Sequence, residues 1–209
     1  MSIRVQCLFK GGIPFSLFHI KPEIRILGID DSALVSDRIL VVGTFFRGGM
    51  WLDGVLSTYI TRDGMDATDS LIRMISASKH RNQARVIMLD GVTYGGFNPI
   101  DIVRLNESTG MGVIVLMRSL PNFENIKNAL YHLECPDERF AIIKKAGSIS
   151  RVVTSHSPTP VYIQCAGIDE ISATRIVQLS ATHSNIPEPL RVAHLIATGI
   201  ICGESCGKP

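Results

Sequence analysis

Charged residues follow several short apolar runs in this sequence, and their chemistry is the most informative feature of the chain. The charges at the ends of these runs are Asp30, Asp31, Asp90 and Arg118. Two further carboxylates, Asp63 and Asp66, belong to the segment RDGMDAT, between a predicted strand and a predicted helix. Ligands and chemistry gather at the carboxyl ends of strands in α/β sheets. These residues are therefore the candidate site.

A divalent metal ion is one interpretation of these carboxylates. Carboxylates that converge in one place repel each other unless a cation lies between them, and hard oxygen ligands suit Mg²⁺ or Mn²⁺. Such an ion polarises a phosphoryl oxygen, and two of them can clamp an in-line displacement. Arg118 would bind the phosphate or offset the charge that develops on it.

Turns and helix caps are the competing interpretation, and the pattern leaves it open. Asp-Gly is a common turn dipeptide, and Asp53, Asp63 and Asp90 each precede a glycine. Asp66 would then be only a helix N-cap. His194 lies beside apolar residues, and we expect a hydrogen-bonded core or cap residue there rather than a ligand. Neither a G-x-G-x-x-G fingerprint nor a P-loop is present, which argues against a bound dinucleotide or nucleoside triphosphate.

Composition places the chain among globular proteins. Hydrophobic residues make up 45% of its 209 residues and charged residues 19%, with a net charge of +2. No apolar run approaches the roughly 20 residues that cross a bilayer, and the N-terminus lacks a signal-peptide pattern, so we expect a cytoplasmic protein without a membrane partner. Cys202 and Cys206 form an isolated C-x3-C, which we interpret as free or adventitiously oxidised thiols.

The elements that must position the charges follow from the hydrophobic pattern. Apolar runs predict strands over residues 25–30, 38–49, 50–61, 85–90 and 112–118, with one or two shorter strands within 151–167. A glycine pair between the second and third strands predicts a hairpin. Helical spacing predicts helices over residues 66–80, 99–108, 122–133 and 168–180, and a last helix that opens at 187.

This order of elements indicates the fold class. Early strands joined by a hairpin, followed by strands that alternate with helices, predict a mixed sheet with helices on both faces. Neither an internal repeat nor a linker interrupts the pattern. We therefore expect residues 1–209 to form one α/β domain.

Four segments resemble a known family. They are LGIDD, RGGMWLDGVLSTYITRDGMDAT, MLDGVTYGGFN and PEPLRVAH. Together they are similar to the mostly archaeal, endonuclease V-like family called endonuclease dU, over roughly residues 21–200. The resemblance implies a ribonuclease H-like fold in a single endonuclease V-like domain. It also implies hydrolysis, with Mg²⁺ or Mn²⁺ as cofactor, of a phosphodiester bond in DNA that contains a deaminated base. For the dU relatives that base is deoxyuridine, which makes DNA the expected partner and DNA repair the expected role.

The resemblance also implies roles for individual residues. Asp30 would be the metal ligand of the first strand and Asp90 the second. Asp66 would be the third ligand, with Asp63 as the next choice. Arg118 would replace the catalytic or phosphate-binding lysine of endonuclease V.

Two family features are missing, and they keep other functions open. The segment STYIT stands where endonuclease V has its PYIP wedge, and Ile168 stands where the late SPGH histidine is expected. Their absence favours a non-catalytic nucleic-acid or nucleotide-binding module that retains the fold. Cleavage of RNA or of inosine-containing strands is a third possibility.

Overall fold

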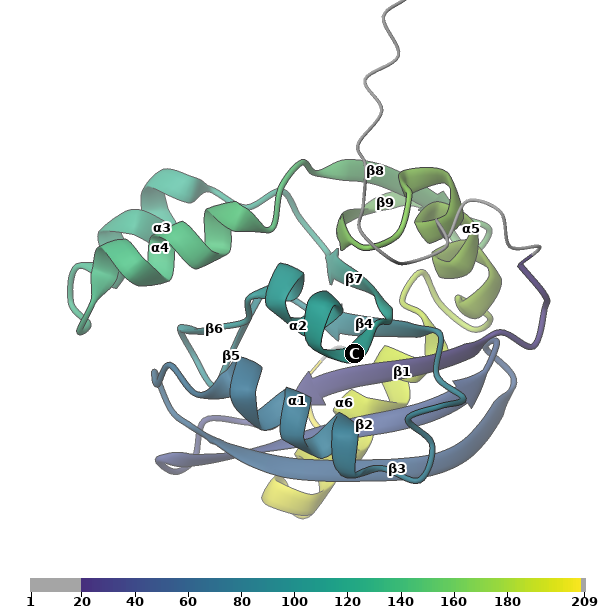
Figure 1. Ribbon diagram of the computed structural model, residues 1–209, viewed down its shortest axis with the longest axis horizontal. Coiled ribbons are helices and arrows are strands. Elements are labelled where there is room, and N and C mark those ends of the chain that lie inside the picture. The colour runs from purple at the N-terminus through teal and green to yellow at the C-terminus, as the bar shows by residue number, and fades with distance from the viewer. Residues whose placement is uncertain (1–19, 208–209) are drawn as a thin grey trace, which may run out of the picture.

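A seven-stranded mixed sheet forms the centre of the protein in the computed structural model, which describes residues 20–207. The strand order is β3-β2-β1-β4-β7-β9-β8, and β1, β4 and β7 run parallel to one another (Figure 1). The strands are β1 (Arg25–Asp31), β2 (Arg38–Arg47), β3 (Trp51–Thr61), β4 (Val86–Asp90), β7 (Gly112–Met117), β8 (Ser150–Thr154) and β9 (Ser157–Ala166). Two short strands, β5 (Thr93–Tyr94) and β6 (Asn98–Pro99), pair separately. The predicted mixed sheet is confirmed.

Six helices accompany the sheet within the described residues. They are α1 (Ala67–Ala77), α2 (Ile102–Thr109), α3 (Phe123–Leu130), α4 (Pro136–Lys145), α5 (Glu170–Ser180) and α6 (Glu188–Cys202). Helices α1 and α2 cover one face, while α5 and α6 cover the other, as predicted. Helices α3 and α4 form a pair beyond the sheet (Figure 1). Within residues 20–207, no helix has the length and apolar character that crossing a membrane requires.

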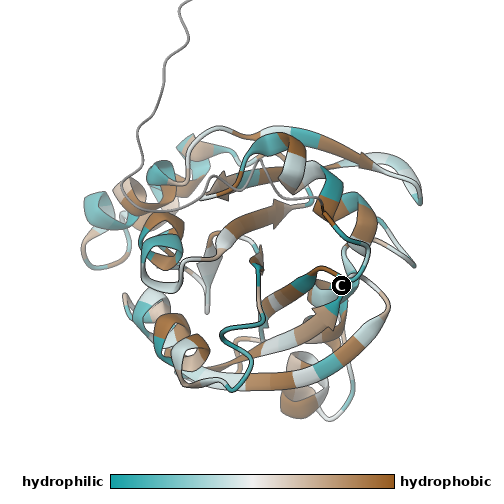
Figure 2. Ribbon diagram, turned by 45° about the vertical axis from the view of Figure 1, so that its right-hand side comes forward, coloured by the Kyte–Doolittle hydropathy of each residue, from teal (hydrophilic) through white to brown (hydrophobic). Residues whose placement is uncertain are grey.

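The central strands are buried on both faces, which explains their continuous apolar sequences. Leu27 and Ile29 of β1 contact the core that includes α1 and α2, whereas Ile26 contacts the core on the α5 side. The side chains of β4 alternate in the same way: Leu89 contacts the core with α1 and α2, and Met88 contacts the core on the α5 side. Figure 2 shows this apolar interior. Side chains at positions 26, 28 and 30 therefore face the same side as those at 86, 88 and 90.

Several boundaries differ from the predictions for local reasons. Helix α1 ends at Ala77 because Ser78 is extended, and residues 79–83 form a turn. Asp66 occupies its N-cap position but makes no capping bond, so the predicted cap is wrong. Helix α2 begins at Ile102, since Asp101 accepts a hydrogen bond from the Arg104 amide and caps it. The prediction missed α4 altogether, although Pro136 at its start is a typical first-turn signal.

Helix α6 docks closely on the sheet because of a glycine in β1. A Cβ atom at Gly28 would lie 2.4 Å from the carbonyl carbon of Pro189, at the start of α6. The Thr44 hydroxyl of β2 donates a buried hydrogen bond of 2.6 Å to the Pro189 carbonyl. The N-terminal turn of α6 is thereby fixed against β1 and β2.

Candidate functional site

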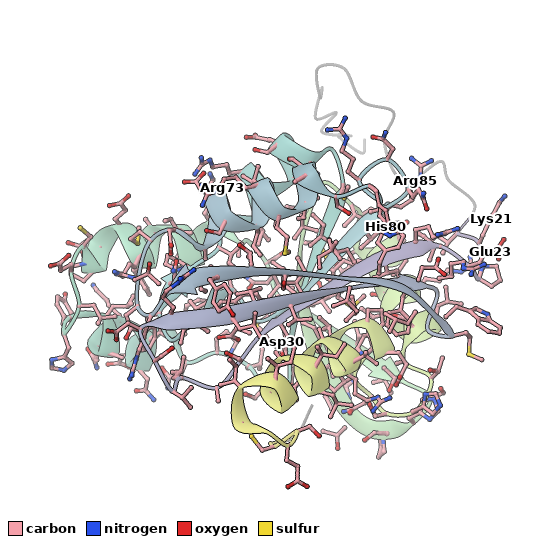
Figure 3. The ribbon with its side chains drawn as sticks, turned by 90° about the horizontal axis from the view of Figure 1, so that it is seen from below. Lys21, Glu23, Asp30, Arg73, His80 and Arg85 are labelled. Atoms are coloured by element: carbon pink, nitrogen blue, oxygen red, sulfur yellow. The ribbon has the colours of Figure 1, made fainter. Side chains whose placement is uncertain are left out.

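Asp30 and Asp90 end neighbouring parallel strands on the same face of the sheet. The register pairs Ile29 with Leu89, and each carboxylate is the next residue along its strand. Because side chains alternate along a strand, both carboxylates point toward the side that α6 covers. Figure 3 shows Asp30 on that side. Parallel strands lie about 4.8 Å apart, so the two residues are held as neighbours by the hydrogen-bond ladder.

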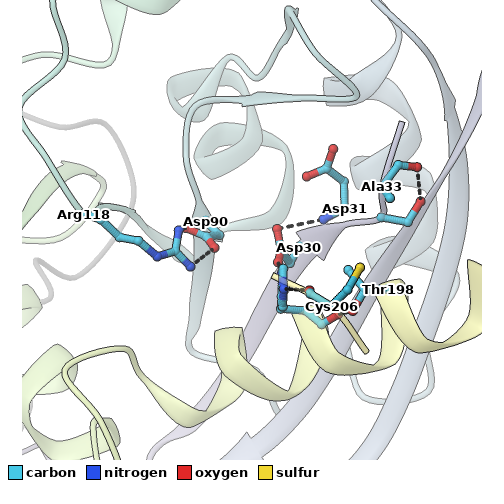
Figure 4. Close-up of a pocket in the computed structure, with 9 residues that line it drawn as sticks. Asp30, Asp31, Ala33, Asp90, Arg118, Thr198 and Cys206 are labelled. Atoms are coloured by element: carbon cyan, nitrogen blue, oxygen red, sulfur yellow. Dashed lines mark hydrogen bonds and ion pairs between the residues drawn. The ribbon is translucent and has the colours of Figure 1, made fainter. Parts of the chain in front are cut away.

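Arg118 joins this pair from the next strand. Asp90 pairs with Leu116 of β7, and Arg118 follows two residues later, on the same face. Its guanidinium donates to both oxygens of Asp90, at 2.9 and 2.8 Å (Figure 4). A guanidinium has five N–H donors, and the Asp90 carboxylate uses two of them. Arg118 thus keeps donors for a second anion.

A pocket of about 390 Å³ contains these residues. Its lining consists of Asp30, Asp31, Ser32, Ala33, Asp90, Arg118, His194, Thr198 and Cys206. The structure therefore brings together three of the four predicted site residues, Asp30, Asp90 and Arg118, and adds a histidine from α6.

His194 pairs with the first carboxylate. Its Nδ1 lies 2.9 Å from Oδ2 of Asp30, and its Nε2 lies 3.0 Å from the carbonyl oxygen of Cys206. A carbonyl oxygen only accepts hydrogen bonds, so Nε2 must carry a proton. The contact between Nδ1 and Oδ2 then requires one further proton, either on the imidazole or on the carboxyl group. Asp30 and His194 consequently share a proton.

Burial makes the carboxylates of this pocket weak acids. The pKa of Asp30, which is only 4% exposed, rises to about 7, mainly because burial disfavours its charged form. Repulsion from Asp90 and Asp31 adds to the rise, while the bond with His194 opposes it. The pKa of Asp31 rises to about 6, again chiefly through burial. The pKa of His194 is raised by its hydrogen bond with Asp30.

Asp31 and Tyr94 hold the ends of β1 and β4 in place. Asp31 leaves β1 on the side opposite Asp30 (Figure 4), and its Oδ2 accepts a 2.6 Å hydrogen bond from the Gly95 amide. The hydroxyl of Tyr94 donates to the Ile29 carbonyl at 2.5 Å and accepts from the Asp90 amide at 3.1 Å. Burial raises the pKa of Tyr94 well above its usual value, so this hydroxyl keeps its proton. Tyr94 links the ends of β1 and β4.

Asp66 lies apart from this pocket. Its carboxylate accepts hydrogen bonds from the amide and the hydroxyl of Thr61, each at 3.1 Å, and from the Asn98 side chain at 2.6 Å. The side-chain Oδ1 of Asn98 accepts a 3.0 Å hydrogen bond from the amide of Ala67, the first residue of α1. The pocket lining does not include Asp66. These bonds give the Asp66 carboxylate a structural role that differs from the predicted N-cap.

Asp63, the other choice for a third ligand, also makes its hydrogen bonds outside the pocket. Its Oδ1 accepts from the Phe97 amide at 2.8 Å, and its backbone has a left-handed φ of 50°. The buried side chain of Arg139 donates to the carbonyl groups of Asp63, Gly64 and Phe97 at 2.7, 2.7 and 2.8 Å. The whole turn is thus a hydrogen-bonded structural unit.

His194 and Tyr94 are absent from the site predicted from the sequence, and Asp31 belongs to it only as a strand-end charge without an assigned role. His194 was expected to be hydrogen-bonded in the core, and it is hydrogen-bonded, but its partner is Asp30. Its position in the segment PEPLRVAH was the available signal. Asp31 is a predicted strand-end charge, and the alternation of side chains along a strand places it on the face opposite Asp30. Tyr94 lies among glycines and gave no signal.

The donor atoms of the pocket suit a magnesium ion. Among residues 20–207, no group of three or more His, Cys, Asp or Glu side chains is arranged to hold a metal ion. Mg²⁺ commonly binds through only one or two carboxylates, with water and substrate phosphate completing its shell. Asp30 and Asp90 supply such a pair in the pocket lining. The residues therefore fit the ion in number and in chemistry.

Solved structures of endonuclease V have the same fold. Human endonuclease V has a TM-score of 0.58 at 16% identity, covering 86% of this chain and 85% of its own. The Ciona intestinalis enzyme, in complex with a 24mer DNA containing an inosine followed by a ribo-adenosine, has a TM-score of 0.59 at 13% identity, covering 86% and 87%. The protein thus has a mixed α/β fold of the endonuclease V and ribonuclease H-like class.

Closer relatives identify the family. A protein of unknown function from Archaeoglobus fulgidus is 41% identical, with a TM-score of 0.77, and covers 85% of this chain and 98% of its own. A UPF0215 protein of Methanosarcina mazei is 60% identical over 191 residues, or 91% of this chain and 97% of that protein. Residues 22–201 match the family model of endonuclease dU. The chain belongs to the endonuclease dU family.

Proposed function

We propose that this protein is a metal-dependent endonuclease that hydrolyses a phosphodiester bond in DNA containing a deaminated base, namely deoxyuridine. Membership of the endonuclease dU family supports the activity and the substrate. The observation that carries the proposal is the placement of Asp30, Asp90 and Arg118 on one face, at the ends of three adjacent parallel strands.

Asp30 and Asp90 would hold Mg²⁺ or Mn²⁺. When bound, such an ion would polarise a phosphoryl oxygen and stabilise the charge that develops on it. It would also favour the ionised form of Asp30. His194 would then carry the shared proton on Nδ1 and donate it in a hydrogen bond to Oδ2, which orients the carboxylate.

Arg118 would bind the scissile phosphate. Its planar guanidinium suits a phosphate, and the donors that Asp90 leaves unused remain available to one. The Arg118 side chain is 42% exposed, so substrate can reach it, whereas the Asp90 side chain is 10% exposed. Asp90 thus fixes the arginine from the protein side while the phosphate approaches from solvent.

A second candidate is a binding module without catalysis. In this structure both oxygens of Asp90 are engaged by Arg118, which competes with a metal ion for the same atoms. An ion pair that persists in the complex would leave a pocket that binds the phosphate backbone but does not cleave it.

A cleavage assay separates the two candidates. Single- and double-stranded oligonucleotides carrying one deoxyuridine, one deoxyinosine or neither base, together with RNA versions, are incubated with Mg²⁺, Mn²⁺ or EDTA. The proteins are wild type, Asp90→Ala, Asp66→Ala and the control Asp69→Ala, which removes an exposed carboxylate paired with Arg104 on the surface. Binding of each oligonucleotide is measured in parallel.

The proposal predicts metal-dependent cutting of the deoxyuridine strands by wild type and by the Asp69 control. In the Asp90 variant we expect a loss on the order of a thousandfold or more, because a ligand is removed. Asp66→Ala tests the third-ligand prediction: full activity excludes that role. Tight binding of damaged DNA without cutting in any metal would replace the nuclease with the binding module.

A further inference from the structure

Two cysteines lie close together beside the pocket. Cys202 is the last residue of α6, and Cys206 lies in the tail that follows the left-handed Gly203. Their Sγ atoms are 3.7 Å apart, and both residues are exposed. A disulfide requires sulfur atoms about 2.05 Å apart, so a small movement of the exposed tail joins them.

The same tail covers His194. The carbonyl oxygen of Cys206 accepts the Nε2 hydrogen bond at 3.0 Å, and Cys206 lines the pocket with Asp30 and Asp90. A Cβ atom at the next residue, Gly207, would lie only 3.4 Å from Nε2. The solvent-facing edge of the imidazole is therefore covered by the segment that carries Cys206.

We propose that Cys202 and Cys206 are a reversible oxidation site, and that their disulfide fixes the tail over His194 and slows the chemistry of the pocket. The effect on catalysis rests on the proposed nuclease function, whereas the disulfide and the shielding of His194 do not. Reduction frees the tail to move away from the imidazole.

The oxidant belongs to the class of small-molecule disulfides. One cysteine thiolate attacks a sulfur atom of the small disulfide and releases the first small thiol, leaving a mixed disulfide on the protein. The second cysteine loses its proton to solvent and displaces the second small thiol, which forms the Cys202–Cys206 bond. One small disulfide is thereby reduced to two thiols, and the two cysteines are oxidised to one disulfide.

The pair differs from the other cysteines that the structure describes. Cys165 is partly buried, and burial raises its pKa to about 12. The pKa of Cys202 is also raised, by its hydrogen bond with Cys206, but both cysteines of the pair are exposed to an oxidant. Cys135 is exposed but lies before α4, and it does not line the pocket. It therefore provides a matched control for oxidation outside the pocket.

The test treats the full-length protein with oxidised or reduced glutathione and follows three readouts. Peptide mass spectrometry detects a linked Cys202–Cys206 peptide that has lost two hydrogen atoms. Diethyl pyrocarbonate, which modifies accessible imidazoles, reports the exposure of His194. Cleavage of the deoxyuridine oligonucleotide reports the activity. Cys202→Ser removes the disulfide without altering the Cys206 carbonyl, and Cys135→Ser is the control.

Oxidised wild type and Cys135→Ser should form the internal disulfide, and modification of His194 should slow by roughly tenfold, because a short disulfide loop makes opening of the tail rarer. Cleavage should fall by a similar factor and recover on reduction, and Cys202→Ser should not respond. Glutathione adducts without the internal bond, or a disulfide that leaves His194 equally reactive, would overturn the inference. If cleavage fails in every sample while His194 is shielded, the nuclease proposal fails and the oxidation site stands.

Discussion

Tyr94 links the backbone segments beside the two pocket carboxylates, Asp30 and Asp90. Its side chain is fully buried, and its hydroxyl bonds the Ile29 carbonyl and the Asp90 amide. Ile29 immediately precedes Asp30, so one oxygen atom links the backbone next to both carboxylates. We interpret Tyr94 as a positioning residue, since it touches the strands rather than the pocket.

Tyr94→Phe should therefore affect activity more than stability. The substitution leaves the Asp90 amide and the Ile29 carbonyl without this partner, which costs about 1–2 kcal/mol of unfolding free energy. We expect kcat to fall by roughly tenfold with KM little changed, because the carboxylates lose their fixed separation while substrate contacts remain. Urea unfolding and steady-state cleavage kinetics measure the two effects.

Tyr59→Phe provides the control for that variant. Tyr59 is 46% exposed on the edge strand β3, and its ring lies under the guanidinium of Arg38. Removing its hydroxyl should change stability by less than about 0.5 kcal/mol. A Tyr94→Phe protein with wild-type kcat would show that Tyr94 does not position the carboxylates.

Helix α6 is the element that completes the pocket, and Gly28 is what allows it to dock. The first turn of α6 lies where any larger side chain of β1 would be, and His194 follows in the same helix. Displacing this helix would move the histidine away from Asp30.

Gly28→Ala should destabilise the protein and weaken the Asp30–His194 contact. The new methyl group would lie 2.4 Å from Pro189 backbone, so helix or strand must move, at a cost of about 2–3 kcal/mol. Gly199→Ala, in the same helix, is the matched control: its Cβ would meet nothing closer than 3.8 Å, and the better helix former should add up to about 1 kcal/mol. Urea unfolding compares the two. Equal stability of Gly28→Ala and wild type would contradict the close docking of α6.

For the molecule as a whole, the sequence predicted those features that depend on local pattern. The apolar runs before Asp30, Asp90 and Arg118 predicted three strands, and the charges marked their ends. The structure shows that these strands are neighbours. Side chains two residues apart on a strand lie on the same face. Each of the three charges therefore shares a face with the residue two positions before it, which is residue 28, 88 or 116. The Asp30–His194 bond joins residues 164 positions apart, and no local pattern specifies such a contact. Asp66 was chosen as the third metal ligand because its position resembles that of a glutamate in the family. In the structure its carboxylate instead makes hydrogen bonds with Thr61 and Asn98, outside the pocket.

Charge in the pocket should lower the stability of the metal-free protein. The folded pKa of Asp30 is about 7 against an ordinary value of 3.8, so the folded state holds this proton more tightly. The resulting stability is present below about pH 4 and is lost as the pH rises through 7. In EDTA at pH 8, Asp30→Asn should therefore be more stable than wild type, by on the order of 1–2 kcal/mol.

Saturating Mg²⁺ should reverse that order, because wild type gains binding energy that the variant lacks. Urea unfolding at pH 4 and pH 8, with and without Mg²⁺, measures both effects, and Asp69→Asn serves as the surface control. A wild type that is more stable than Asp30→Asn in EDTA at pH 8 would contradict this account of the pocket.

The docking of α6 on β1 also has a consequence for synthesis of the protein. A nascent chain that has emerged just past β7 already contains both carboxylates and Arg118, on or directly after strands that pair with one another. His194 belongs to α6, which is synthesised later, so Asp30 has no proton-sharing partner until then. A growing chain therefore carries a pocket without His194 until α6 has left the ribosome.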